Sequence, residues 1–495
     1  MIEKLDPRNK LNDLTGKEWI ISTKSVWRFD DYDLDKNLPE NMRHFQKLIL
    51  FFSKKNDLIL NPTKNQMIIK IGLKEGRRVA LESNDLADFI LHEDFPSYNI
   101  LDFISKKDIK FHLERYKKFY EVLKNKKYLC VITRIFLPNT SELVLYHHYL
   151  SSISAEVGFK LKGLIVWVPK IEKGQNYLMN DIILIFRKEA DSAKNIDFNF
   201  KNYDSREFLS KIRFFKTYML SIPPPRDDLK SQHPATFAES DIKNLVLHFT
   251  ALSEHPRVLD PFSGVGSTIL ACLESKIEGW GIELTKKWIS ITKKRFNKIN
   301  QPIRINGKLH KPKQIELNSY SKDSQHQPII QNLLFGDARE KLDEIDDEFF
   351  DFIVTSPPYW GILTKKIDHK TRKERVDKGL DLKYSVEGED ETFKQDLGNL
   401  ENYGEFLNQL KEIFKKCFNK LKKGKYFAVI VSDFRDGSYF FLYHCDIAFI
   451  LKEIGFKLTG FTILHQDNKN LYPYGYPFAF VSNIHHQNII IVKKE

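Results

Sequence analysis

The chain of 495 residues contains 78 Lys or Arg and 66 Asp or Glu residues, which gives a net charge of +12 at pH 7. Because a typical domain holds about 150 residues, this length predicts more than one domain. The basic balance suits a polyanionic partner such as a nucleic acid, and the lack of an apolar run approaching about 18 residues excludes a membrane-spanning helix.

The cysteines and the N-terminus predict a reduced, cytoplasmic protein. The sequence has four cysteines, namely Cys130, Cys272, Cys417 and Cys445. They show neither disulfide nor metal-ligand spacing, so we expect no metal site. The first residues lack the apolar core of an export signal.

Matching motifs in the two halves of the chain predict an internal repeat. Residues 128–132 resemble residues 426–430, and Leu-Tyr-His at 145–147 recurs at 442–444 with nearly the same offset. Strands alternate with helices in both halves, which is typical of parallel sheets covered on both faces. The sequence therefore predicts an α/β protein with two Rossmann-like domains in tandem, over residues 1–205 and 206–495.

The N-terminal copy lacks the residues that a nucleoside site needs. Its loop, Asn61 to Gln66, has no glycine, and without glycine the backbone cannot make the close turn that brings its amides against a ligand. We expect neither cofactor nor catalysis there. Lys and Arg residues between 54 and 78 favour a scaffold or DNA-binding role, although a solvated charged surface explains them equally well.

Residues 257–273 are predicted to form a strand, a tight turn and a helix. Gly264 and Gly266 permit the turn and let the backbone approach a ligand. Glu283 ends the next strand, where a carboxylate can accept hydrogen bonds from both hydroxyls of a ribose. A further short apolar run leads into Asp337.

The segment from Asp351 to Trp360 is an apolar strand that runs into a serine, two prolines and two aromatic residues. Consecutive prolines forbid helix or sheet directly afterwards. The Ser356 hydroxyl and the carbonyls beside the prolines are therefore expected at the carboxyl end of the strand, where they can accept from an amino group. Tyr359 offers a flat face for a base, and ligands of parallel sheets bind at this edge.

The rest of the chain contains two predicted insertions and the closing elements of the fold. Residues 301–330 are polar without periodicity, and residues 365–399 are first basic, which suits phosphate contacts or a solvated loop, and then acidic. Helices are expected over residues 406–421 and 440–455, with strands over 426–432, 456–464 and 488–492. The loop at 472–478 is rich in aromatic residues, and we expect most of them to pack in the core or in turns and not to stack on bases.

Together these motifs resemble the DNA amino-methyltransferases, over roughly residues 220–495. The segment 355–360 is similar to their catalytic motif, whose Ser-Pro-Pro-Tyr form, with Trp following, points to the N4 atom of cytosine. The segment 260–268 is similar to their S-adenosylmethionine motif. The resemblance implies a methyltransferase-type domain in the second half and a degenerate copy of it in the first.

The resemblance also implies a role for individual residues. Its implied catalytic residues are Ser356, Pro357, Pro358 and Tyr359. Its implied residues for S-adenosyl-L-methionine are Asp260, Pro261, Phe262, Gly264, Gly266, Glu283 and Asp337. In this family an aspartate such as Asp337 contacts the adenine amino group, and the segment from His233 to Phe237 packs beside the methionine portion.

The expected reaction is direct methyl transfer to the exocyclic N4 of a cytosine that is flipped out of double-stranded DNA. We expect the protein to act in a restriction-modification or related system, with a cognate restriction endonuclease as a partner. Adenine N6 is the nearest alternative target; a non-catalytic DNA-binding or regulatory protein, and RNA methylation, are the others. Because two copies of one fold share surfaces, we also expect a monomer whose halves pack as an intramolecular pseudo-dimer.

Overall fold

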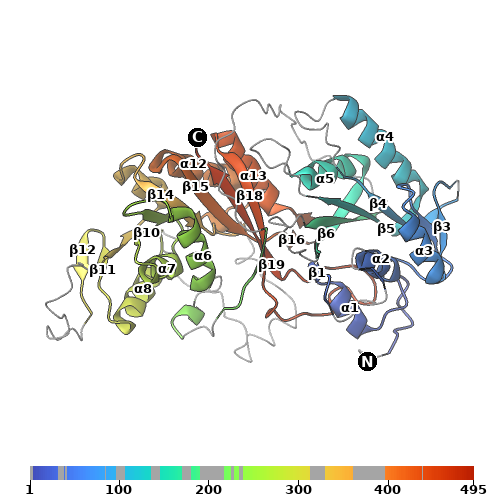
Figure 1. The fold of residues 1–495 in the computed structure, drawn as a ribbon, viewed down its shortest axis with the longest axis horizontal. Coiled ribbons are helices and arrows are strands. Elements are labelled where there is room, and N and C mark those ends of the chain that lie inside the picture. The colour runs from blue at the N-terminus through green and yellow to red at the C-terminus, as the bar shows by residue number, and fades with distance from the viewer. Residues whose placement is uncertain are drawn as a thin grey trace. The chain divides into compact units, whose positions relative to one another are not determined.

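The computed structural model describes residues 4–31, 38–39, 42–83, 85–95, 106–134, 145–169, 180–189, 217–223, 228–232, 238–312, 329–360, 396–437 and 439–495. They form a mixed α/β fold with large, mostly parallel sheets (Figure 1), which confirms the predicted fold class. The predicted domain boundary near residue 205 lies outside the described residues. No helix among the described residues is both long and apolar enough to cross a lipid bilayer.

The chain divides into two compact units, each made of several segments. The first unit comprises Met1–Leu220, Ser432–Cys445 and Phe461–Asn488. The second unit comprises Ser221–Val431, Asp446–Gly460 and Ile489–Glu495. Segments near the C-terminus therefore belong to the first unit, which a single cut at residue 205 does not anticipate.

The first sheet has seven strands in the order β1-β6-β7-β5-β4-β2-β3. Strand β7 runs antiparallel to both β5 and β6, while the other pairs are parallel. The strands are β1 (Val26–Arg28), β2 (Leu58–Leu60), β3 (Arg78–Ala80), β4 (Ala87–Glu93), β5 (Leu123–Arg134), β6 (Phe159–Val168) and β7 (Asp181–Lys188).

The second sheet has ten strands in the order β12-β11-β13-β10-β9-β14-β15-β19-β18-β8. The strands are β8 (Tyr218–Leu220), β9 (Arg257–Asp260), β10 (Glu278–Glu283), β11 (Ile303–Ile305), β12 (Lys308–His310), β13 (Gln331–Phe335), β14 (Phe350–Thr355), β15 (Leu421–Val431), β18 (Lys457–His465) and β19 (His486–Lys493). The polar stretch after residue 300, predicted as a surface insertion, thus begins with two strands of this sheet.

The two sheets share one strand order, with β8-β18-β19-β15-β14-β9-β10 repeating the whole of the first sheet. Even an irregularity recurs, because the register shifts between Ala87 and Phe89 in β4 and between Phe350 and Phe352 in β14. This agreement is the structural counterpart of the repeat seen in the sequence. The second sheet differs by the extra strands β13, β11 and β12.

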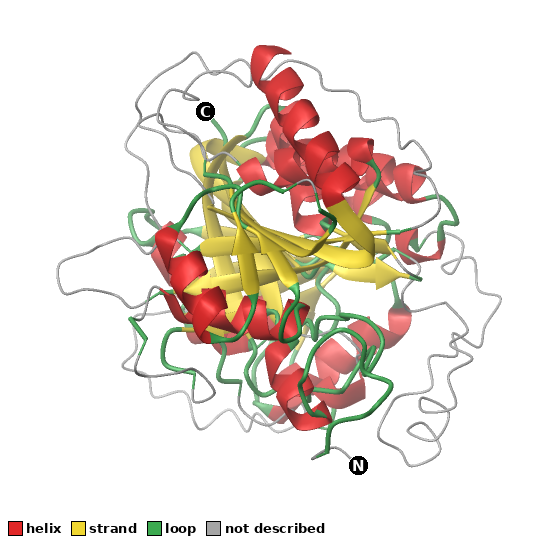
Figure 2. Cartoon of the chain, turned by 90° about the vertical axis from the view of Figure 1, so that its right-hand side faces the viewer, coloured by secondary structure: helices red, strands yellow, loops and turns green. Residues whose placement is uncertain are grey.

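Helices lie on both sides of the strands (Figure 2), as parallel crossovers require. In the first half they are α1 (Gly16–Ser22), α2 (Arg43–Phe52), α3 (Gln66–Lys74), α4 (Lys106–Val122) and α5 (Tyr146–Val157). In the second half they are α6 (Glu239–Thr250), α7 (Ser267–Glu274), α8 (Lys286–Lys298), α9 (Ala338–Lys341), α12 (Tyr403–Lys420) and α13 (Tyr443–Ile454). The two helices and three strands predicted beyond residue 400 are all present, within a few residues of the expected bounds.

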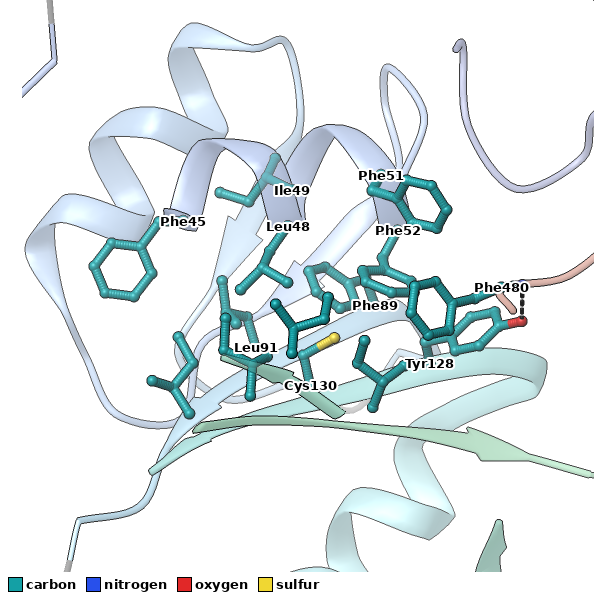
Figure 3. Packing of buried hydrophobic residues seen from close by; sticks show 14 of the residues in the cluster. Phe45, Leu48, Ile49, Phe51, Phe52, Phe89, Leu91, Tyr128, Cys130 and Phe480 are labelled. Carbon is teal, nitrogen blue, oxygen red and sulfur yellow. Dashed lines mark hydrogen bonds between the residues drawn. The ribbon is translucent and has the colours of Figure 1, made fainter. Parts of the chain in front are cut away.

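The core of the first unit contains several packed aromatic residues, one of which comes from far along the chain. Phe480 lies among Phe51, Phe52 and Tyr128, and its backbone N–H donates to the Tyr128 hydroxyl at 3.0 Å (Figure 3). Phe480 is buried, so the segment that carries it is part of the first unit's core.

Candidate active site

The carboxyl ends of four neighbouring parallel strands meet at one edge of the second sheet. Strands β13, β10, β9 and β14 are adjacent, and Glu283 of β10 pairs with Phe335 at the end of β13. Asp260 and Glu283 end their strands, Ser356 follows directly after β14, and Asp337 is the second residue after β13. The predicted site residues on these strands are therefore brought together in the second unit.

The loop between β9 and α7 makes the tight turn that its glycines predict. Gly264 and Gly266 have φ values of +53° and +79°, in the left-handed region that favours glycine. A Cβ atom on Gly266 would lie 2.6 Å from Cγ2 of Thr292 in α8. A side chain is therefore excluded both by conformation and by the close approach of α8.

Asp260 is fully buried and connects the loop, α7 and β14. Its Oδ1 accepts from the Phe262 backbone N–H at 3.0 Å and from the Thr355 hydroxyl at 2.6 Å, and its Oδ2 accepts from the Thr268 hydroxyl at 2.5 Å. Burial raises the pKa of this carboxyl, and the hydrogen bonds from Thr268 and Thr355 oppose that rise. Both threonines, which the sequence analysis did not single out, hold the two motifs against each other.

Glu283 binds the glycine loop through its carboxylate. Oε2 accepts from the Gly264 backbone N–H at 2.8 Å, and Oε1 accepts from the Thr285 backbone N–H at 2.7 Å. Each oxygen keeps a lone pair for a further donor such as a ribose hydroxyl. Burial raises the pKa of Glu283 to about 7, and the charge of Asp396 contributes to the rise.

Asp337 caps the N-terminus of α9 and forms an ion pair with Arg339. Its Oδ1 accepts from the Arg339 backbone N–H at 2.8 Å, and its Oδ2 accepts from the guanidinium at 2.5 Å. The same guanidinium donates to the Gln409 side chain of α12 at 2.6 Å. The sequence predicted Asp337 as a ligand of adenine, but not the arginine that fixes its orientation.

The Ser-Pro-Pro-Tyr-Trp segment leaves the sheet where β14 ends. Every residue of β14 is buried, Pro357 is buried, and Ser356, Pro358, Tyr359 and Trp360 are half-buried. The indole N–H of Trp360 donates to the Leu400 carbonyl at 2.8 Å, and its ring lies 5.1 Å from that of Tyr403. The tryptophan thus fixes the end of the motif to the start of α12.

A short segment before α12 returns to this edge of the sheet. Asp396 precedes a 3-10 turn, η5 (Leu397–Asn399), and accepts from the Gly398 backbone N–H at 2.9 Å. A Cβ atom on Gly398 would lie 3.3 Å from the Tyr359 carbonyl oxygen. Burial raises the pKa of Asp396. The sequence had placed these residues in an insertion, because nothing local links them to residues near 283 and 359.

Three predicted features of the site lie outside the described residues. These are His233 and Phe237, which were expected beside the methionine portion of the cofactor, and the basic stretch 365–375. Pro261 and Phe262 lie in the described turn between β9 and α7, and Phe262 contributes the backbone N–H that binds Asp260.

Comparison with known proteins identifies the family. The family described as DNA methylase matches residues 93–294 and 350–495, which is well over half of the chain. A stretch of 30 residues is 57% identical to the type II methyltransferase M.SmaI of Serratia marcescens, covering 6% of this chain and 10% of that protein. The chain thus spans only about a tenth of the length of this relative.

Solved structures resemble the chain at low sequence identity. A SAM-dependent methyltransferase from Methanosarcina mazei has 13% identity and a TM-score of 0.28, covering 50% of this chain and 96% of that one. A candidate DNA modification methylase from Thermus thermophilus, solved with S-adenosyl-L-methionine, has 24% identity and a TM-score of 0.22, covering 32% and 53%. On the match to the family itself, the chain belongs to the DNA methylase family.

Proposed function

We propose that this protein methylates the exocyclic N4 of a cytosine at specific sites in double-stranded DNA. The observation that carries the proposal is the position of Ser356 to Tyr359 at the end of β14, next to the glycine loop and bound to it through Thr355 and Asp260. A serine before the two prolines favours cytosine, because the resembled enzymes that act on adenine more often have an aspartate there.

The residues at the end of β14 can activate a poor nucleophile. The lone pair of the cytosine amino group is delocalised into the ring, so it must be turned toward the methyl donor. The Ser356 hydroxyl and the Pro357 carbonyl would accept the two amino hydrogens and draw the nitrogen toward tetrahedral geometry. A neutral serine is a weak base, so the proton leaves after methylation, when the nitrogen is cationic and acidic.

The target base must leave the duplex to reach this position. Flipping costs a few kcal/mol, and stacking of the base on the Tyr359 ring offsets part of that cost.

The net charge of +12 favours binding to phosphates. The first half would act as a scaffold or a second DNA-binding surface in a pseudo-dimer, and a restriction endonuclease would be the partner in a restriction-modification system.

One experiment separates this proposal from its alternatives. The full chain is incubated with labelled S-adenosyl-L-methionine and either double-stranded DNA or RNA, and the product is digested to nucleosides for mass spectrometry. We expect N4-methylcytosine from DNA only, and at least about 100-fold less of it from the Ser356→Ala variant. N6-methyladenine would move the target to adenine, and label in RNA would replace DNA as the substrate. Cofactor binding without any methylation would favour a regulatory protein.

A further inference from the structure

The repeated Leu-Tyr-His motif places two histidines in contact within the first unit. His147 belongs to α5 and His444 to the start of α13, and their Nε2 atoms are 2.8 Å apart. The rings are stacked, with centroids 5.1 Å apart and planes inclined by 23°. Equivalent histidines of the two copies are thus in direct contact. Neither histidine belongs to the proposed methylation site.

A thiol completes a group of three metal-binding atoms. Cys445 Sγ lies 3.3 Å from His147 Nε2 and 3.2 Å from His444 Nε2, and all three residues are buried. Around a tetrahedral Zn²⁺, bond lengths of about 2.0–2.3 Å set such ligand atoms about 3.3–3.6 Å apart. Shifts of about half an ångström or less would therefore admit the ion.

A carboxylate behind the cluster orients one of the imidazoles. Asp433 Oδ1 lies 2.6 Å from Nδ1 of His444 and accepts from the His444 backbone N–H at 3.2 Å. This contact places the His444 proton on Nδ1 and leaves the Nε2 lone pair facing His147 and Cys445. In zinc sites, a histidine ligand commonly donates a hydrogen bond from its other ring nitrogen to a carboxylate.

The charges of the buried groups also match a divalent ion. Asp433 is 3% exposed, and no described group forms a hydrogen bond with its Oδ2. A carboxylate buried in this way needs a compensating positive charge. The Asp433 carboxylate and the Cys445 thiolate carry one negative charge each, and together they would balance the two positive charges of Zn²⁺. An ion of charge +1 would leave one negative charge unbalanced.

Hydrogen bonds alone do not account for all three contacts. With the His444 proton on Nδ1, the lone pair of its Nε2 can accept from the His147 N–H or from the Cys445 S–H, but not well from both at these distances. If His147 donates from Nε2, that atom cannot accept from the thiol either. One pair in the cluster is therefore left without a hydrogen bond, which a shared cation would resolve.

A second cluster in the same unit lacks these features. His465, Asp467 and His485 also lie close together, but Asp467 is exposed. The Ser25 backbone N–H donates to Nδ1 of His485 at 3.2 Å, so that nitrogen is the acceptor and the ring proton sits on Nε2, the atom that would have to ligate. This cluster provides a control for the first.

We propose that His147, His444 and Cys445 bind one Zn²⁺, with a non-protein ligand in the fourth position. The ion would cross-link α5 to the first residues of α13 and stabilise the first unit. The sequence predicted no metal site because spacing rules examine nearby residues, whereas His147 is close to the other two ligands only in the fold. The proposal is independent of the base that is methylated.

The test uses the full chain, purified without chelator and analysed for zinc by mass spectrometry. We expect one Zn²⁺ per chain, and a lower Tm after removal with a chelator that added Zn²⁺ restores. Cys445→Ser and His147→Gln should retain the fold by circular dichroism and bind zinc at least about tenfold more weakly. The matched controls are Cys417→Ser, a buried thiol elsewhere, and His465→Gln in the second cluster, and both should keep the ion.

Cobalt gives a readout that does not depend on stability. Co²⁺ added to the metal-free chain should produce the absorption of a tetrahedral site with a thiolate-to-cobalt band, and Cys445→Ser should lose that band while Cys417→Ser retains it. Substoichiometric zinc with no saturable uptake of added Zn²⁺ or Co²⁺ would overturn the proposal. A metal content that Cys445→Ser leaves unchanged, or that His465→Gln abolishes, would also overturn it.

Discussion

At the scale of single residues, the candidate site separates groups that would contact the substrate from groups that hold the site together. Ser356 and Tyr359 are half-buried at the end of a buried strand, whereas Asp260 is fully buried and hydrogen-bonded by two threonines. Substitutions in the two classes should therefore affect different measurements.

Ser356→Ala and Tyr359→Ala should each reduce methylation by about 100-fold or more, because the first removes an acceptor for the amino group and the second a stacking surface. Neither side chain forms part of the glycine loop, so S-adenosyl-L-methionine should bind within a few-fold of the wild-type affinity by calorimetry. Asp260→Ala should show the converse, with cofactor binding weakened first. Full activity in Ser356→Ala would contradict the assignment.

Glu283 should make cofactor binding depend on pH. Its pKa is raised by burial to about 7 from an ordinary 4.5, so its contribution to folding stability is full below 4.5 and is lost as the pH rises through about 7. The ionised carboxylate is the better acceptor for ribose hydroxyls. Affinity for S-adenosyl-L-methionine should therefore rise between about pH 6 and pH 8. Glu283→Gln should flatten this profile in calorimetry, and an unchanged profile would remove Glu283 from the site.

At the scale of elements, β4 and β14 are the same strand of the fold with different chemistry at their ends. They share their register with β5 and β15, so His92 and Glu93 take the places of Thr355 and Ser356. Asp94 follows and is buried in a network. Its contacts are His92, His112, Arg115, Tyr116 and Tyr146. The end of β4 is thus filled by side chains from α4 and α5.

Asp94→Asn should destabilise the protein by about 3 kcal/mol, because it removes the charge that several buried donors share. Burial alone would raise the pKa of Asp94, but the hydrogen bonds from His112 and His92 hold it below its ordinary value of 3.8, so the contribution is full above that pH and is lost as the pH falls. Urea unfolding at pH 7 measures the effect. The exposed Asp85→Asn is the control, and equal stability of the two variants would contradict the prediction.

How far the sequence predicts an element depends on how local its determinants are. The glycine loop and the Pro-Pro motif were found because glycine and proline restrict the backbone at their own positions. Without glycine, the turn after β2 was not expected to bring its amides against a ligand; in the structure Lys64 enters the left-handed region at φ +60° and Asn65 caps α3. Asp396 was missed because its charge acts on Glu283 through a proximity that only the fold creates. Arg339 was missed although it pairs with Asp337 only two residues away.

At the scale of the whole molecule, the two compact units are not two consecutive stretches of chain. The first unit includes residues 461–488, and Phe480 from this segment is 2% exposed within its aromatic core. In the aromatic loop just before it, Tyr476 packs against that core, and the Trp19 indole donates to the Tyr474 carbonyl at 3.1 Å. The expectation that these aromatics serve packing holds for Tyr476, whereas the side chains of Tyr474 and Phe478 are exposed.

A fragment of residues 206–495 should therefore expose apolar surface, because it retains Phe480 and its neighbours without the residues that bury them. We expect low solubility, strong binding of a hydrophobic dye, and proteolytic cleavage between residues 466 and 485. The full chain under the same conditions is the reference. A fragment that unfolds cooperatively at the Tm of the full chain would show that this segment does not depend on the first half.

Beyond β10 the second sheet continues with three strands that have no counterpart among the described strands of the first sheet. Asp337 stands at the end of β13, a strand beyond β10, whereas among the described residues the first sheet ends at β3. If Asp337 contacts the adenine of the cofactor, as the resemblance implies, the corresponding strand is not present among the described residues of the first half. We therefore expect that reverting the loop at 61–66 to a glycine-rich sequence would not by itself create a cofactor site there.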